Sequence, residues 1–339
     1  MMGKMSMAGR ETLLAYHVMK HYVGLKEGEQ VMILADSETD DSLVEAFASA
    51  AYFFNAEPTI VVTPPSFREL EKLPSKVALK ALEAADVYIP MTPTSGHSVH
   101  ATEVARLKSE KKLRMFIIGG WHGGGMDDAL DALRNHDYEK IYEVTSKVAG
   151  VMNKGKRVRV TTPGGTDFTA SIEDIPCRVA AGICRQMGES GCIPAGEAWS
   201  GPAEGTTNGV IILDSTIMNI CERPEGPKTP VRVTVKDGRV VKVEGGEEAA
   251  KLRAIIENVK NADNMAEISV GTNHHLKHTG RVLSDKRRYG TMHVAFGQNT
   301  YQIYPKGTVE CDVHIDAVLQ NPVLEVDGRK IVEGGKILL

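Results

Sequence analysis

The sequence predicts an α/β protein in which a doubly wound domain with a parallel sheet precedes a β-rich (α+β) domain. Up to about residue 150, short Val- and Ile-rich runs alternate with segments whose apolar residues recur at helical spacing. After residue 155, alternating strand-like runs joined by glycine-centred turns replace this pattern. We therefore expect two domains, over residues 1–152 and 153–339.

Each element of the first domain follows from its pattern. The strands are the four short apolar runs bounded by turn residues, a pattern typical of buried parallel strands; they cover residues 31–35, 59–62, 86–90 and 115–119. The helices are the amphipathic segments before and between them, at residues 11–23, 41–54, 70–85 and 100–112. Four such units predict a doubly wound sheet.

The second domain is predicted from its hairpins. Asp237-Gly238 and Asp327-Gly328 each separate two runs of alternating hydrophobicity, which indicates two-residue hairpin turns. One amphipathic helix, over residues 247–262, interrupts the strands.

Composition excludes several function classes. The chain has 339 residues, 42% of them hydrophobic, and a formal net charge of -4, so it carries no basic field for nucleic acid or anionic membrane. Its five cysteines form no CxxC pair, which favours reduced thiols. The N-terminus lacks the unbroken apolar stretch of a signal peptide. We therefore expect a cytoplasmic protein that binds neither nucleic acid nor a membrane.

Five residues in strand-like segments have side chains suited to a metal ion. His314 and Asp316 flank Ile315, and residues two apart in a strand share a face. His293 stands among apolar residues, while Glu267 and Glu197 stand at the edges of predicted strands, where a buried carboxylate needs a partner or a cation. Two glutamates, two histidines and an aspartate are the inventory of a two-metal hydrolase. The alternatives are an exposed edge strand and a neutral core histidine.

Six blocks, in this order, resemble the aminopeptidase T (leucyl aminopeptidase T-like) metallopeptidases: MTPTSGHSVHATEVARL, RVTTPGGTDFTASI, IPAGEAWSGPAEGTTNGVIILD, AEISVGTN, DKRRYGTMHVAFGQNTY and HIDAVLQNPVLEVDG. The resemblance implies a homodimer in which each chain holds two divalent ions of zinc, cobalt or manganese. It assigns six metal ligands, with Tyr304 as a second candidate for the tyrosine: Glu197, Glu267, His293, Tyr301, His314 and Asp316.

A second branch that this scaffold resembles contains the 2,5-dihydroxypyridine 5,6-dioxygenases. These are similar in length and share the HxD pair. The resemblance implies a single Fe(II) held by two histidines and an aspartate, and a proton acceptor upstream in the first domain. His100 matches that acceptor, with His97 as a weaker candidate. The segment QIYPKGTVEC replaces the glycine-rich segment usual in the metallopeptidases, which leaves the substrate open.

These observations predict a metal-dependent hydrolase that cleaves a peptide or amide bond of a small-molecule or short-peptide substrate with a metal-activated water. Glu197 would bridge the ions or accept the proton of that water, and His100 would act as general acid or substrate ligand. The alternative is a mononuclear Fe(II) ring-cleaving dioxygenase, and a third hypothesis is a metal-stabilised binding protein without catalysis.

Two further segments are interpreted by their composition. GGWHGGGMDD (119–128) predicts a flexible rim with Trp121 and His122 near the substrate. We expect His97 to contact the substrate as well. The remaining histidines, His274, His275 and His278, are interspersed with basic residues, which favours a solvated loop able to steer an anionic substrate; those basic residues are Lys277, Arg281, Lys286 and Arg287.

Overall fold

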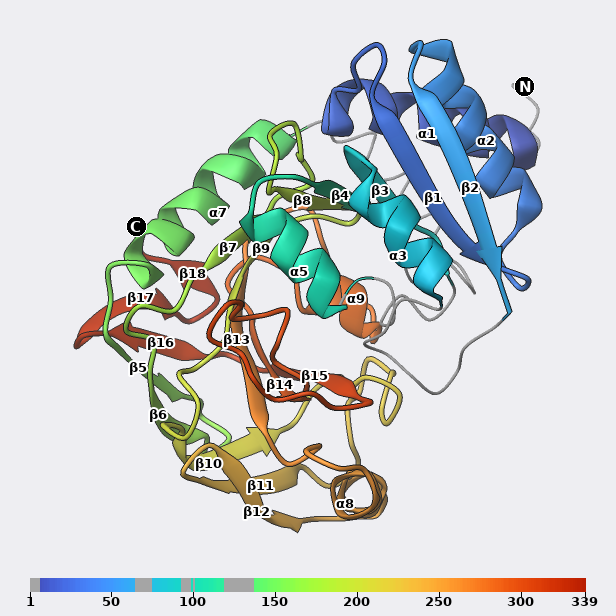
Figure 1. Ribbon diagram of the computed structural model, residues 1–339. Helices are drawn as coiled ribbons and strands as arrows, with labels where there is room; N and C mark the ends of the chain where they lie inside the picture. Colours follow the sequence, from blue (N-terminus) through green and yellow to red (C-terminus); the bar gives the residue numbers. More distant parts are fainter. Residues whose placement is uncertain (1–6, 65–74, 93–98, 100, 119–136) are drawn as a thin grey trace, which may run out of the picture. The chain divides into compact units, whose positions relative to one another are not determined.

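The computed structural model describes residues 7–64, 75–92, 99, 101–118 and 137–339 (Figure 1). Two compact units emerge, each formed by two stretches of chain. Unit 1 comprises Met1–Tyr138 and Ala181–Ala195, and unit 2 comprises Glu139–Ala180 and Gly196–Leu339. Residues 139–152 thus belong to unit 2, and residues 181–195 belong to unit 1. The division therefore differs from a single boundary after residue 152.

Unit 1 contains a five-stranded sheet in the order β2-β1-β3-β4-β8, and each neighbouring pair is parallel. The strands are β1 (Gln30–Asp36), β2 (Glu57–Thr63), β3 (Val87–Pro90), β4 (Arg114–Ile117) and β8 (Ser190–Cys192). β1 and β2 contain the predicted runs at residues 31–35 and 59–62, and β3 and β4 overlap the predicted runs at 86–90 and 115–119. The fifth, β8, comes from the stretch that returns to unit 1, and it pairs with β4 at Met115, Phe116 and Ile117.

Capping residues explain where several helices of unit 1 begin or end. α1 (Met7–His17) continues into a π-helix (Val18–Val23) that ends at Gly24 in the left-handed conformation. α2 (Asp41–Phe53) and α3 (Lys76–Glu83) begin where the side chains of Asp40 and Ser75 accept backbone N–H groups. α5 (Thr102–Ser109) connects β3 to β4. α1 and α2 share one apolar cluster with β1 and β3, whereas α3 packs with α5 outside that cluster. A strand order that reverses direction beside β1 is typical of a doubly wound sheet.

Unit 2 contains an eight-stranded sheet in the order β12-β11-β10-β6-β5-β16-β17-β18. Its strands are β5 (Arg157–Thr161), β6 (Asp167–Ser171), β10 (Asn208–Leu213), β11 (Val231–Lys236), β12 (Arg239–Glu244), β16 (Val323–Val326), β17 (Arg329–Glu333) and β18 (Lys336–Ile337). Both predicted hairpins form. Asp237 and Gly238 have φ of 49° and 73°, and Asp327 and Gly328 have 49° and 81°, as a type I′ turn requires.

A second, five-stranded sheet of unit 2 has the order β15-β14-β13-β9-β7. Its strands are β7 (Arg178–Ala180), β9 (Glu197–Ser200), β13 (Met265–Gly271), β14 (Met292–Gly297) and β15 (His314–Leu319), and all neighbours are antiparallel. The helices are α7 (Tyr138–Met152), α8 (Glu247–Asn258) and the single turn α9 (Val282–Asp285). These elements confirm the mixed α/β class, with a parallel sheet early in the chain and antiparallel sheets after it.

The core of unit 2 draws on both of its sheets. Ile268, Val294 and Ala317 lie in one row across β13, β14 and β15, and all three belong to the same apolar cluster as Val158 and Ile211 of the larger sheet. One face of the five-stranded sheet is therefore committed to the core, because its side chains alternate between faces. The opposite face is free to present polar residues.

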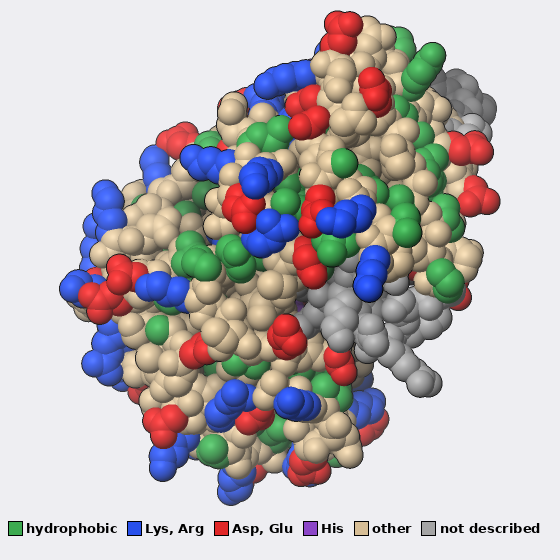
Figure 2. All heavy atoms as spheres, viewed as in Figure 1, with side chains coloured by type: hydrophobic (Ala, Val, Ile, Leu, Met, Phe, Trp, Pro, Cys, Tyr) green, Lys and Arg blue, Asp and Glu red, His purple; other side chains and the backbone are tan. Residues whose placement is uncertain are grey.

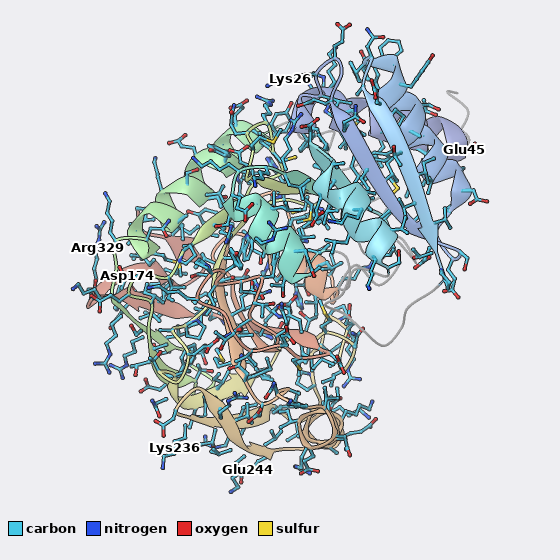
Figure 3. The ribbon with its side chains drawn as sticks, in the orientation of Figure 1. Lys26, Glu45, Asp174, Lys236, Glu244 and Arg329 are labelled. Carbon is cyan, nitrogen blue, oxygen red and sulfur yellow. The ribbon has the colours of Figure 1, made fainter. Side chains whose placement is uncertain are left out.

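Acidic and basic side chains are interspersed on the surface. On the face drawn in Figure 2, acidic and basic groups alternate without a patch of one sign. Figure 3 labels six charged residues whose side chains point away from the ribbon: Lys26, Glu45, Asp174, Lys236, Glu244 and Arg329. Among the described residues, no helix combines the length and the apolar character needed to cross a membrane.

Candidate metal centre

The second face of the five-stranded sheet collects acidic and imidazole side chains. Ala295 of β14 is opposite Glu267 of β13 on one side and Asp316 of β15 on the other. His293 and His314 each lie two residues before a member of this row, so they share its face. The same alternation along β13 and its pairing with β9, where Gly271 is opposite Glu197, adds that glutamate.

The five potential metal ligands lie close together. His293 Nε2 lies 2.9 Å from Glu267 Oε1 and 3.2 Å from Glu197 Oε1. His314 Nε2 lies 3.0 Å from Glu267 Oε2 and 3.4 Å from Asp316 Oδ1. Glu267 therefore stands between the two imidazoles and gives one oxygen to each.

These donors form two groups, each of which could hold a metal ion. One is Glu197, Glu267 and His293, and the other is Glu267, His314 and Asp316; within each group the ligand atoms lie within 4.8 Å of one another. All five side chains are buried, at most 7% exposed. Burial at this density of charge costs several kcal/mol per ion unless cations compensate.

Two basic side chains supply part of that compensation. Lys286 directly follows α9, and its Nζ lies 3.0 Å from Asp316 Oδ2 and 3.4 Å from Glu197 Oε1. Arg287 Nε donates to Glu197 Oε2 at 3.2 Å. Both basic residues are buried, with 7% and 8% of their surface exposed. The prediction that they belong to a solvated loop is therefore wrong.

A second layer of hydrogen bonds orients the donors. The Ser269 hydroxyl donates to Glu267 Oε1 at 2.7 Å. His314 Nδ1 lies 3.0 Å from the carbonyl oxygen of Gln298, so an N–H at Nδ1 donates to that carbonyl and Nε2 faces the carboxylates. A fixed Nδ1 partner of this kind is what a metal-binding histidine requires.

Electrostatics in the absence of a metal favours charged forms throughout the site. Burial lowers the pKa of His314, but Asp316 and Glu267 outweigh it and raise the pKa to about 10. Burial and the Lys286 ammonium likewise lower the pKa of His293, while hydrogen bonds to Glu197 and Glu267 raise it to about 9.

The carboxylates shift in the opposite direction. Burial raises their pKa, and the nearby cations outweigh burial, so the pKa values of Glu197, Glu267 and Asp316 all fall below their ordinary range. Burial lowers the pKa of Lys286, but the carboxylates of Asp316 and Glu197 raise it by more, which keeps the ammonium charged.

The donor set fits a divalent metal ion. Carboxylate oxygen and imidazole nitrogen bind Fe(II), Mn(II), Co(II) and Zn(II). Asp316 Oδ1 is buried and accepts no hydrogen bond within the described part of the chain. A buried carboxylate oxygen in that condition is costly, and a cation would satisfy it.

The remaining predicted site residues are two tyrosines of unit 2 and four residues of the first domain. Tyr301 is buried and its ring stacks on Trp199, with centroids 5.0 Å apart and planes at 8°. Tyr304 is half-buried, and its carbonyl accepts a hydrogen bond from Arg178. The predicted catalytic and substrate residues of the first domain lie outside the described residues: His97, His100, Trp121 and His122.

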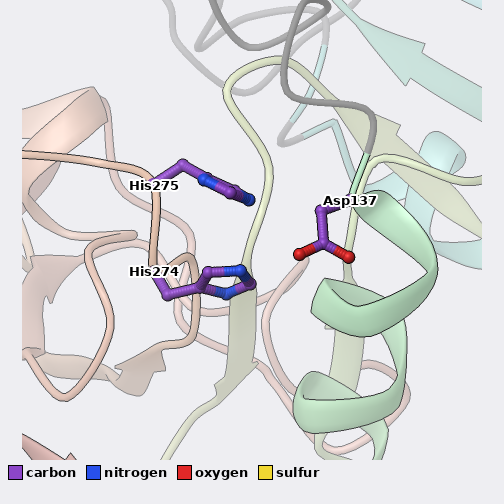
Figure 4. A group of neighbouring side chains, drawn as sticks. All are labelled: Asp137, His274 and His275. Carbon is purple, nitrogen blue, oxygen red and sulfur yellow. The ribbon is translucent and has the colours of Figure 1, made fainter.

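The late histidines lie in unit 2 after β13. His274 and His275 have adjacent rings, with centroids 4.1 Å apart (Figure 4). His278 Nε2 lies 2.7 Å from the carbonyl of Pro224, and its Nδ1 lies 3.1 Å from Asp285 Oδ2. His278 thus ties this loop to neighbouring segments of unit 2.

Sequence reasoning missed Lys286 and Arg287 as parts of the centre. The segment DKRRY has three consecutive basic residues, which by composition is typical of a solvent-exposed turn. The available signal was the number of buried carboxylates on one sheet face, since such a cluster needs internal cations.

Comparisons with known proteins agree on this scaffold. A family model described as 2,5-dihydroxypyridine 5,6-dioxygenase (NicX) matches residues 15–339. Among solved structures, 2,5-dihydroxypyridine dioxygenase from Pseudomonas putida KT2440 is similar, with a TM-score of 0.81, 19% identity and 98% of each chain covered. AmpT from Thermus thermophilus is also similar, with a TM-score of 0.66, 16% identity, and 97% of this chain and 99% of its own covered. No curated protein matches the sequence at a significant level.

Proposed function

Because the chain belongs to the 2,5-dihydroxypyridine 5,6-dioxygenase family, we propose that it is a metal-dependent dioxygenase that opens a hydroxylated pyridine or similar ring with molecular oxygen. The observation that carries this proposal is the family match over residues 15–339, which includes every donor of the buried centre. The sequence analysis gives a hydrolase as the main prediction and a dioxygenase as the alternative, so the proposal reverses their order.

The buried centre suits such a reaction. Fe(II), when bound, supplies the one-electron chemistry that allows an aromatic ring to react with oxygen. Glu267, His314 and Asp316 would hold it, because they combine nitrogen and oxygen donors with a carboxylate oxygen that accepts no hydrogen bond. In ring cleavage by a dioxygenase both atoms of O₂ enter the product, so the carbon–carbon bond breaks without an external reductant.

The protein's own groups would exclude water and hold the donors. Side chains at the centre are at most 8% exposed, so reactive species are shielded from solvent. Arg287 donates to Glu197, and Ser269 donates to Glu267, which fixes both carboxylates before substrate arrives. We propose His100 as the proton acceptor, with His97 as the weaker candidate, as the family resemblance implies.

Oxygen consumption tests this function. Protein loaded with Fe(II) under anaerobic conditions would be mixed with 2,5-dihydroxypyridine and ¹⁸O₂, with oxygen uptake and product mass recorded. We expect uptake and incorporation of both labelled atoms. Glu267→Gln should abolish the reaction, while Glu244→Gln, a matched change at the surface, should leave it unchanged. Absence of oxygen uptake with this and related hydroxylated rings would contradict the proposal.

A hydrolase of the aminopeptidase T kind is the second candidate, favoured by one observation. Two three-residue donor groups share Glu267, the arrangement from which a two-metal site can be built. Anaerobic release of an amine from leucine amide or short peptides, in protein loaded with Mn²⁺ or Co²⁺, would support it against the dioxygenase.

A further inference from the structure

Lys286 links the two donor groups of the centre. Its Nζ contacts Asp316 Oδ2 at 3.0 Å and Glu197 Oε1 at 3.4 Å, and these two carboxylates belong to different groups. The contacts bring a compact, permanent positive charge between them. A cation bridging two carboxylates within such a site has the same electrostatic role as a metal ion there.

Glu197 has both of its oxygens occupied by cations. Lys286 contacts Oε1, and Arg287 donates to Oε2. Asp316 differs, because Lys286 contacts only Oδ2 and Oδ1 accepts no hydrogen bond within the described residues. Asp316 thus keeps a carboxylate oxygen that neither Lys286 nor Arg287 contacts, and Glu197 does not.

Charge balance also favours one ion over two. The three carboxylates have a formal negative charge of three, and the two basic side chains that contact them, Lys286 and Arg287, offset two, which leaves one negative charge. One divalent ion beside neutral imidazoles changes this remainder to one positive charge. Two divalent ions would leave three positive charges among buried groups, a far more expensive state.

The position of Lys286 is built into the fold. Asp285, the last residue of α9, is fully buried and accepts hydrogen bonds from the backbone N–H groups of Thr279 and Gly280 at 2.7 and 2.9 Å. These bonds fix the turn from which Lys286 and Arg287 extend. The ammonium therefore stands ready before any metal arrives.

We propose that the Lys286 ammonium takes the place of a second metal ion, so that the centre binds one divalent ion, at Glu267, His314 and Asp316. This inference rests on the metal centre of the proposed function, but it does not depend on the substrate. Lys286 is then the residue that separates a one-metal centre from a two-metal centre on this scaffold.

Metal counting tests the inference with Mn²⁺ as the probe. Each variant is stripped with chelator, saturated with Mn²⁺ and separated from free ion, and bound manganese is measured by elemental analysis. We expect one ion per chain in the wild type and two in Lys286→Met, where the bridging charge is gone. Lys286→Arg, which keeps a positive charge, and Lys236→Met, a matched surface change, should each bind one.

Two carboxylate variants locate the ion without altering Lys286. Glu197→Gln should retain one Mn²⁺ and Glu267→Gln should bind none. Two ions in the wild type, one ion in a folded Lys286→Met, or loss of the ion in Glu197→Gln would each overturn the inference. If Lys286→Met fails to fold by circular dichroism, a wild-type count of two or loss of the ion in Glu197→Gln still overturns the inference. A count of one without oxygen uptake would refute the proposed function alone.

Discussion

Lys286 Nζ lies 3.0 Å from Asp316 Oδ2, while His314 Nε2 approaches the other oxygen of the same carboxylate at 3.4 Å. One carboxylate oxygen of Asp316 therefore pairs with a permanent cation, and the other faces the position proposed for the metal. The arrangement follows from strand alternation, which puts His314 and Asp316 on one face of β15, and from the turn after α9, which directs Lys286 toward them.

Removal of the Lys286 charge should destabilise the metal-free protein. Lys286→Met leaves Asp316 and Glu197 buried with fewer cations, and breaking a buried pair costs about 3–5 kcal/mol. Denaturant unfolding in chelator should show this loss, whereas Lys236→Met should remain within about 0.5 kcal/mol of wild type. Added Mn²⁺ should recover part of the stability. Equal stability of Lys286→Met and wild type in chelator would contradict the electrostatic account.

Stability of the metal-free protein should fall as the pH rises from 7 to 10. Folding raises the pKa of His293 from 6.5 to about 9 and that of His314 to about 10. Their protonated forms stabilise the folded state fully below pH 6.5, and this contribution is lost as the pH passes through the folded values. The loss should amount to a few kcal/mol, measured by urea unfolding at each pH.

Two features make this pH test specific. The carboxylates have lowered pKa values, so their contribution is lost only as the pH falls into the acid range, outside the window tested. His314→Gln should flatten the slope between pH 7 and 10. A wild-type stability that is constant or rising across this window would show that the imidazoles are neutral in the metal-free protein.

Metal binding should release protons. His314 must lose a proton before Nε2 can bind an ion, and its raised pKa means that it is protonated at pH 7 in the metal-free protein. Affinity for Mn²⁺ should therefore rise with pH, about tenfold per unit for each proton released. Calorimetry in buffers of different ionisation heat measures that number directly. Affinity that is independent of pH between 6 and 9 would oppose this assignment.

Gly196 should tolerate no side chain. Its φ is +111°, and an added Cβ would lie 2.8 Å from the backbone nitrogen of Asn273. Gly196→Ala should cost about 1–3 kcal/mol of stability and displace the adjacent Glu197. Gly205→Ala is a matched control, because Gly205 also has a positive φ but has open space around it. A larger cost at Gly205 than at Gly196 would contradict the packing argument.

The sequence predicted the fold best where each element is determined locally. Asp237-Gly238 formed its hairpin because both residues accept positive φ, and the run at residues 31–35 became the buried strand β1. The pairing of β8 with β4 depends on a long-range return of the chain, which periodicity cannot reveal. Helix α7 was not predicted at all, and α8 ends earlier than expected, at Asn258.

The candidate site shows the same limit. His314 and Asp316 were predicted to share a face because their spacing fixes it within one strand. The burial of Lys286 and Arg287 could not be predicted, because it depends on carboxylates supplied by two strands that are distant in sequence, β9 and β15. Partner choice across a sheet is a tertiary property, and the local composition of DKRRY indicated solvent instead.

The most direct test of the central claim is an anaerobic titration with Fe(II), followed at each step by oxygen uptake with 2,5-dihydroxypyridine. We expect the rate to rise linearly and to reach its maximum at one Fe(II) per chain, with one O₂ consumed per ring opened. No oxygen uptake at any loading, together with amide hydrolysis that requires two ions per chain, would contradict both the dioxygenase and the one-metal centre.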